Sequence, residues 1–98
     1  MKIICKVKEV LEPRSFRSSD EEVAVQGILV DNMGVDLYAE GFDKMAAKMQ
    51  KAGIAEGDVV QMDVTVSSRV KNSEKGVFYS TNARVDNFSI LVKSDKAF

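Results

Sequence analysis

The chemistry open to this chain is limited first by the residue types that it lacks. Its 98 residues include no histidine and a single cysteine, Cys5. Without histidine the chain cannot build a Ser-His-Asp or Cys-His catalytic set, and zinc sites lose their commonest ligand. The sequence also contains no nucleophile–base pair, glycine-rich phosphate loop or cysteine cluster. We therefore expect no enzyme activity, no metal site and no cofactor.

The residues best suited to chemistry are cations close to aromatic side chains, at two separate places in the chain. One place is a polar segment at residues 13–21, and the other is a polar segment at residues 72–76. The residues concerned are Arg14, Phe16 and Arg17 in the first segment, and Lys71, Lys75 and Phe78 in and around the second. Cations bind backbone phosphates and aromatic rings stack on bases, so this combination suits a single-stranded nucleic acid.

The distribution of charge supports a basic face. The chain as a whole carries a net charge of −1, yet residues 1–19 sum to +3, residues 20–63 to −7 and residues 64–98 to +3. If the fold brings the two basic segments together, they form a surface that attracts phosphates. The alternative is that the charges serve solubility and that the segment sums scatter by chance.

Hydrophobic periodicity predicts five strands and one helix. The fourth strand shows strict alternation, and the second strand is apolar on both faces with Gly27 at a bend or bulge. The expected strands cover residues 2–11, 22–30, 35–41, a fourth from about 59 to 71, and 77–85, with 86–92 as a continuation or short extra strand. Residues 13–21 are expected to form a loop and residues 31–34 a tight turn.

The predicted helix begins after Asp43, which we expect to cap it, and ends at Gly53. Its apolar side chains recur at helical spacing, and its lysines fall towards solvent. The apolar stripe consists of Phe42, Met45, Met49 and Ala52.

The order of elements is that of the five-stranded Greek-key barrel called the OB-fold, with the helix between strands three and four. Three features carry the resemblance: the Gly27 strand with its turn at residues 31–34, the Phe42-Asp43 step into a short helix, and residues 57–60 leading into a long fourth strand. Over residues 2–92 the chain resembles OB-fold single-strand nucleic-acid-binding proteins and small bacterial OB-fold proteins of unknown function. The alternative fold is an α+β meander with the helix packed across one open sheet.

The resemblance implies where a ligand would bind. OB-fold proteins commonly hold single-stranded nucleic acid or oligosaccharide on the second and third strands, between the first loop and the final hairpin. We therefore expect a nucleic-acid site formed by Arg14, Phe16, Arg17, Tyr38, Arg69, Lys71, Lys75, Phe78, Asn82 and Arg84.

Several of these residues have a structural alternative. Phe16 could plug the mouth of the barrel, Phe78 could form a dimer contact or a hydrophobic lid, and the surface arginines could simply solvate the sheet. Tyr38 lies between Asp36 and Glu40 on one strand face, and carboxylates repel a phosphate backbone.

The final hairpin has one register that keeps polar residues opposite polar residues. That register sets Lys71 opposite Phe78 and Arg69 opposite Ser80, because a one-residue slip would invert every face. It predicts a polar ribbon that also carries Asn82 and Arg84, with the Phe78 ring exposed beside Lys71.

We therefore expect one OB-fold domain over residues 1–98, frayed at 94–98, that binds single-stranded DNA or RNA without sequence specificity. The alternative is a protein-interaction or homodimeric accessory module with no nucleic-acid binding. No apolar run approaches the ~20 residues that span a bilayer, and the start of the chain lacks the apolar block of a signal peptide. A lone cysteine favours a reducing compartment, so we expect a cytoplasmic protein.

Overall fold

The computed structural model describes residues 1–94, without the side chains of Ser18, Arg69, Lys71, Ser73 and residues 78–81. Strands and one helix follow each other along this part of the chain. They are β1 (Lys2–Val10), β2 (Arg14–Ser18), β3 (Glu21–Asn32), β4 (Val35–Phe42), α1 (Lys44–Ala52), β5 (Val59–Ser73) and β6 (Gly76–Val92). The five predicted strands are present, and residues 86–92 continue the last one.

The strands form one closed sheet. Its order is β1-β5-β6-β4-β3-β2, and an additional pairing of β1 with β3 completes the ring. The first half of β1 pairs with β5 and the second half pairs with β3, with a register shift between Val7 and Glu9. This shift lets one strand serve both sides of the barrel. The predicted barrel is therefore confirmed, and the open α+β meander is wrong.

Residues 14–18 form a strand, so the prediction of a loop at residues 13–21 is wrong. β2 continues the direction of β1 beyond Pro13 and pairs antiparallel with the first half of β3, from Arg14↔Val25 to Ser18↔Glu21. Ser19 and Asp20 close this hairpin with positive φ angles. Both faces of β2 are exposed to solvent, so the sequence lacks the apolar alternation that marks a half-buried strand.

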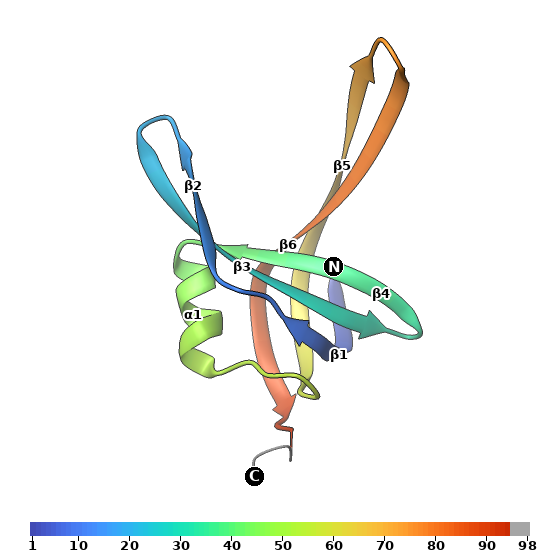
Figure 1. Ribbon diagram of the computed structural model, residues 1–98. Helices are drawn as coiled ribbons and strands as arrows, with labels where there is room; N and C mark the ends of the chain where they lie inside the picture. Colours follow the sequence, from blue (N-terminus) through green and yellow to red (C-terminus); the bar gives the residue numbers. More distant parts are fainter. Residues whose placement is uncertain (95–98) are drawn as a thin grey trace.

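Two hairpins therefore project from the barrel as arms. Figure 1 shows the β2–β3 arm and the β5–β6 arm rising from the same side of the molecule, with a space between their tips. In the second arm the register is as predicted, with Lys71 opposite Phe78 and Arg69 opposite Ser80. The pairing runs on to Ser73↔Gly76, so the hairpin loop is shorter than expected.

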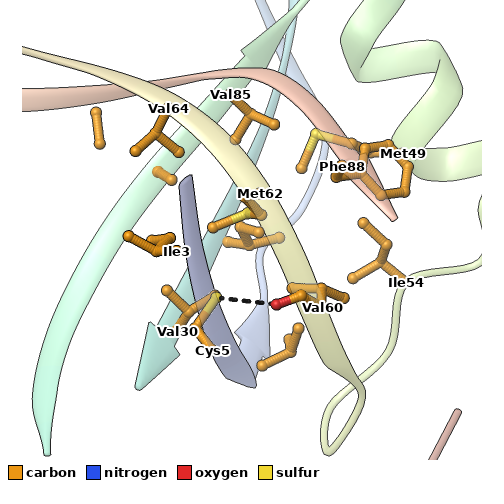
Figure 2. Packing of buried hydrophobic residues seen from close by; sticks show 14 residues of the cluster. Ile3, Cys5, Val30, Met49, Ile54, Val60, Met62, Val64, Val85 and Phe88 are labelled. Carbon is orange, nitrogen blue, oxygen red and sulfur yellow. Dashed lines mark hydrogen bonds between the residues drawn. The ribbon is translucent and has the colours of Figure 1, made fainter. Parts of the chain in front are cut away.

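The core fills the barrel below the arms. Val60, Met62 and Val64 of β5 are fully or almost fully buried, and they pack with Val85 and Phe88 of β6 (Figure 2). Val66, the next residue on the same face of β5, is 44% exposed. The barrel therefore ends between Val64 and Val66, and beyond that point the arm has no core to cover its apolar face.

Helix α1 closes one end of the barrel. Met49 is 1% exposed and belongs to the core cluster, as the predicted stripe requires. Ala46 is buried as well, whereas Ala52 is exposed. The buried face of the helix therefore includes Ala46 and excludes Ala52 of the predicted stripe. The helix approaches β4 so closely that a Cβ at Gly41 would lie 2.5 Å from the Met49 sulfur atom.

The structure confirms the predicted C-terminal end of the helix but not the predicted cap at its N-terminal end. Gly53 takes the left-handed conformation (φ 68°), and its N–H donates to the carbonyl oxygens of Gln50 and Met49, as expected for a helix C-terminus. Asp43 makes no side-chain hydrogen bond to the helix, so its predicted capping role is wrong. Its carboxylate instead accepts a hydrogen bond from the Ala24 N–H at 3.2 Å, which ties the start of the helix to β3.

A buried carboxylate fastens the end of β6 to the loop before β5. Asp58 has no exposed surface. It accepts hydrogen bonds from the Ala55 N–H at 2.9 Å, the Lys93 Nζ at 2.6 Å and the Ser94 N–H at 2.7 Å. Burial alone would raise the pKa of this carboxyl, but the hydrogen bonds and the Lys93 charge outweigh it and lower the pKa. Ser94 is thus anchored, whereas the rest of the predicted frayed tail, residues 95–98, lies outside the described residues.

Replacing Met49 with aspartate should lower the melting temperature strongly. The new carboxylate would lie in the place of the Met49 side chain, which is 1% exposed. Burying an unpaired charge there would cost several kcal/mol. Ala47→Asp is the matched control, because Ala47 is exposed on the same helix. Thermal unfolding of both variants tests the packing of α1, and similar melting temperatures would show that Met49 does not face the core.

Replacing Asp58 with asparagine should lower the free energy of unfolding at neutral pH by on the order of 1–3 kcal/mol, because it removes charged hydrogen bonds from a buried site. The folded pKa of Asp58 lies below its ordinary value, which is about 3.9 in an unfolded chain. The charge therefore stabilises the fold fully above about pH 5, and this contribution is lost as the pH falls through the folded pKa.

Urea unfolding of the wild type and of Asp58→Asn measures this difference as a function of pH. The gap between the two proteins should be constant near neutral pH and should shrink below about pH 4. Glu9→Gln serves as the control, because Glu9 is an exposed carboxylate on β1. A gap that widens in acid would contradict the role given to Asp58.

Candidate functional site

A groove of about 300 Å³ lies between the bases of the two arms. Residues from four strands line it. They are Arg14 and Phe16 of β2, Glu40 and Phe42 of β4, Ser67 of β5, and Asn82, Ala83 and Arg84 of β6. The floor forms where β4 and β6 run parallel, with Glu40 beside Arg84. The groove thus depends on a contact between strands that are distant in the sequence.

One wall of the groove is aromatic. The rings of Phe16 and Phe42 meet edge to face, with centroids 6.5 Å apart and planes at 88°. Phe16 is 43% exposed, so the alternative that it plugs the barrel is wrong. Edge-to-face contact restricts the Phe16 ring while leaving part of its surface open to a ligand.

Arg14 is held by a carboxylate on the floor of the groove. Its guanidinium donates to the Glu40 Oε2 atom, and the Tyr38 hydroxyl donates to the same oxygen at 3.0 Å. Hydrogen bonding with Tyr38 and the charge of Glu40 raise the pKa of Arg14. The Glu40 side chain is 13% exposed. The carboxylate that was expected to repel phosphate is therefore largely covered and paired with a cation.

Arg84 is held in a similar way on the other side of the floor. Its Nε atom donates to Asp86 at 2.9 Å, and its Nη2 atom lies 3.4 Å from the Thr65 hydroxyl. Thr65 also donates to Asp86, and these hydrogen bonds together with the Arg84 charge lower the pKa of Asp86. The Arg84 side chain is 58% exposed, so the guanidinium is oriented yet accessible.

Tyr38 lies over Gly27, which explains the glycine in the middle of β3. A Cβ at position 27 would lie 2.4 Å from the Tyr38 hydroxyl oxygen and 2.9 Å from its ring. The pairing of β3 with β4 runs without interruption through Gly27↔Glu40, so the expected bulge is absent from this edge. The glycine makes room for the Tyr38 side chain, at the point where β3 changes its partner from β2 to β1.

The structure gathers some of the predicted site residues and separates others. Arg14, Phe16, Asn82 and Arg84 meet in the groove, and Tyr38 lies beside Arg14 along a neighbouring hollow. Arg17 lies with Ser15 and Glu22 at a second hollow on the β2–β3 arm, and Phe16 borders both this hollow and the groove. Lys75 is exposed at the tip of the other arm. The side chains of Arg69, Lys71 and Phe78 lie outside the described part of the structure.

Sequence reasoning did not assign Phe42, Ser67 or Glu40 to the site. Helical spacing predicts that Phe42 belongs to the apolar stripe of the helix, and the sequence indicates only that the charge of Glu40 would repel phosphate. Their place in the groove follows from the parallel contact of β4 with β6, and local periodicity carries no signal for such a long-range contact. The alternation of β4, which sets Tyr38 and Glu40 on one face, was the available clue.

A reactive thiol and a metal site are both absent from the described part of the chain. Cys5 is buried, and burial followed by the charge of Asp31 raises the pKa of its thiol to about 11, so the reactive thiolate is absent at neutral pH. Among residues 1–94, no group of three or more acidic or cysteine side chains is placed to hold a metal ion. No helix within the same residues has the length and apolar character needed to cross a membrane.

Replacing Gly27 with alanine tests the contact with Tyr38. In the wild type, the new methyl group should displace the Tyr38 ring, break its hydrogen bond to Glu40 and destabilise the fold by about 1 kcal/mol. In a Tyr38→Ala background the same change should stabilise, since alanine costs less backbone entropy than glycine. Thermal unfolding of the four proteins measures the coupling, and equal effects in both backgrounds would contradict the contact.

Comparison with known proteins identifies the architecture. The second OB-fold domain of replication protein A from Methanococcus maripaludis superposes with a TM-score of 0.62 at 18% identity, covering 95% of this chain and 84% of that domain. The mitochondrial single-stranded DNA binding protein Rim1 from S. cerevisiae gives 0.64 at 11% identity, covering 96% and 95%. No protein-family model and no curated protein matches the sequence. The chain therefore has the OB-fold, and one of the two proteins that it resembles in structure is named as a single-stranded DNA binding protein.

Proposed function

We propose that this chain is a small module that binds single-stranded DNA or RNA in the groove between its two arms, with most of the affinity independent of sequence. The observation that carries the proposal is the convergence of two oriented guanidinium groups and an exposed aromatic ring from two strands that are distant in the sequence, β2 and β6. Phosphates pair with guanidinium groups, and every base has a face that can stack on phenylalanine.

The cations divide into two groups by their role. Arg14 and Arg84 are oriented by Glu40 and Asp86, and each guanidinium has further N–H donors that can reach a phosphate. Arg17 and Lys75, on the two arms, would draw the strand towards the groove by charge. Arg69 and Lys71 belong to the same proposal through their place in the register of the β5–β6 arm.

Stacking would supply the rest of the affinity. Phe16 presents a ring fixed by Phe42, and Phe78 is proposed to do the same from the opposite arm. Tyr38 would contribute little to stacking, because its ring covers Gly27 and its hydroxyl group donates a hydrogen bond to Glu40. Each stacked base is worth about 1–3 kcal/mol, whatever its identity.

A second function is favoured by a different surface. Val66, Val70 and Val77 lie on the face of the β5–β6 arm that turns away from the groove, and they are 44%, 57% and 53% exposed. Such an apolar face suits a protein partner or a second copy of the chain. The alternative function is therefore a protein-interaction or homodimeric module, without enzyme activity, and we propose the cytoplasm as its location in either case.

A salt titration separates the two functions. Binding of a mixed-sequence single-stranded oligonucleotide should weaken linearly on a log–log plot of affinity against salt concentration, with a slope of about 0.7 for each phosphate contact. The interaction module predicts no oligonucleotide binding at any salt concentration, together with association of the protein in sedimentation experiments. The first result supports nucleic-acid binding, and the second rules it out.

Neutralising two arginines of the β2–β3 arm should flatten this slope. Arg14→Gln with Arg17→Gln should reduce it by up to about 1.4, the share of two contacts, and should weaken binding. Glutamine keeps a hydrogen-bond donor for Glu40 but removes the charge opposite this largely covered carboxylate. The free energy of unfolding should therefore fall by about 1–3 kcal/mol for the change at position 14 and by no more than about 0.5 kcal/mol for the change at position 17. The control is Lys44→Gln with Lys51→Gln, which removes the same charge from the exposed side of α1. Equal slopes in the two variants would show that this arm does not touch phosphate.

A further inference from the structure

The groove contains a carboxylate at the place where a phosphate-binding surface would be expected to avoid one. Glu40 lies on the floor, between Arg14 and Arg84, and its side chain is 13% exposed. Covering a carboxylate costs solvation free energy. A purely electrostatic groove would bind phosphate better with a neutral residue at this position. Holding Arg14 accounts for the Oε2 atom of this carboxylate, and the role of Oε1 is still to be assigned.

The hydrogen bonds of Glu40 leave part of the carboxylate for a ligand. The Arg14 guanidinium and the Tyr38 hydroxyl both donate to Oε2. Among the described residues, no hydrogen bond to Oε1 is found. A carboxylate has about four acceptor positions in all, so Oε1 can accept from a donor that enters the groove. Because Arg14 and Tyr38 fix Oε2, the carboxylate has a defined orientation.

We infer that Glu40 makes the groove select bases that carry an exocyclic amine over thymine and uracil. The inference rests on the proposed function, since it assumes that single-stranded nucleic acid binds here. A base stacked on Phe16 would present its edge to the floor, where Glu40 and Phe42 lie on the same face of β4. Carboxylates accept hydrogen bonds from amino groups such as N4 of cytosine.

The same geometry disfavours uracil and thymine. These bases carry a carbonyl oxygen where cytosine carries its amino group. An oxygen facing the Glu40 carboxylate would leave two acceptors in contact without a proton between them, and this arrangement is costly in a partly dry site. Phosphate contacts on the arms would remain the same for every base, so selection would act at one position of an otherwise tolerant strand.

Oligo-dC and oligo-dU of equal length are the matched probes. The two bases have the same size, both lack the thymine methyl group, and they differ at the edge that would meet Glu40. At neutral pH the wild type should bind oligo-dC at least about fivefold more tightly than oligo-dU, which is the lower end of discrimination for a good base contact.

Glu40→Gln tests the assignment directly. Glutamine can present either an acceptor or a donor, so the ratio of the two affinities should fall to within about twofold, mainly through tighter binding of oligo-dU. Asp36→Asn is the control, because it removes one negative charge from the same face of β4 outside the groove lining. This control should keep the wild-type ratio.

Other outcomes overturn the inference in distinguishable ways. Equal wild-type affinities for both oligonucleotides would overturn base selection and leave the proposed function intact. A Glu40→Gln protein that binds both probes more weakly but keeps their ratio would show that Glu40 only positions Arg14. Failure of the wild type to bind either probe at low salt would overturn the proposed function as well.

Discussion

The parallel contact between β4 and β6 is the constraint on which both the fold and the groove depend. It pairs Ala39 with Ala83 and Glu40 with Arg84. The two alanines are buried, and their small side chains fit a barrel interior already filled by larger residues. The next residue along each strand faces outwards. Closing the barrel therefore also sets a carboxylate beside a guanidinium on the floor of the groove.

The core and the proposed binding groove use different parts of the same strands. β5 contributes Val60, Met62 and Val64 to the core and then leaves the barrel with Val66 exposed. A two-stranded ribbon is marginally stable on its own in water, so the arms depend on the barrel for their order. Side chains near the bases of the arms, such as Phe16 and Arg84, lie where that support is strongest.

The sequence predicts those features that short-range physics controls. Three such features are confirmed by the structure. They are the alternation of β5, the glycine at the end of α1 and the register of the β5–β6 hairpin. The sequence does not predict β2, because a strand that is exposed on both faces lacks the alternation of apolar and polar residues. The places of Glu40 and Phe42 in the groove follow from a parallel contact between distant segments, and no local pattern encodes it.

The carboxylates of the groove orient its two arginine side chains and, by cancelling their charge, reduce the attraction for a distant anion. Arg14 and Arg84 each pair with a carboxylate, so the floor is close to neutral and adds little long-range attraction. A guanidinium already held in one orientation loses less side-chain entropy when it meets a phosphate. Attraction at a distance would then come from the exposed cations of the arms, such as Arg17 and Lys75. Separating attraction from orientation would let a chain of net charge −1 hold a polyanion, as proposed, without being basic throughout.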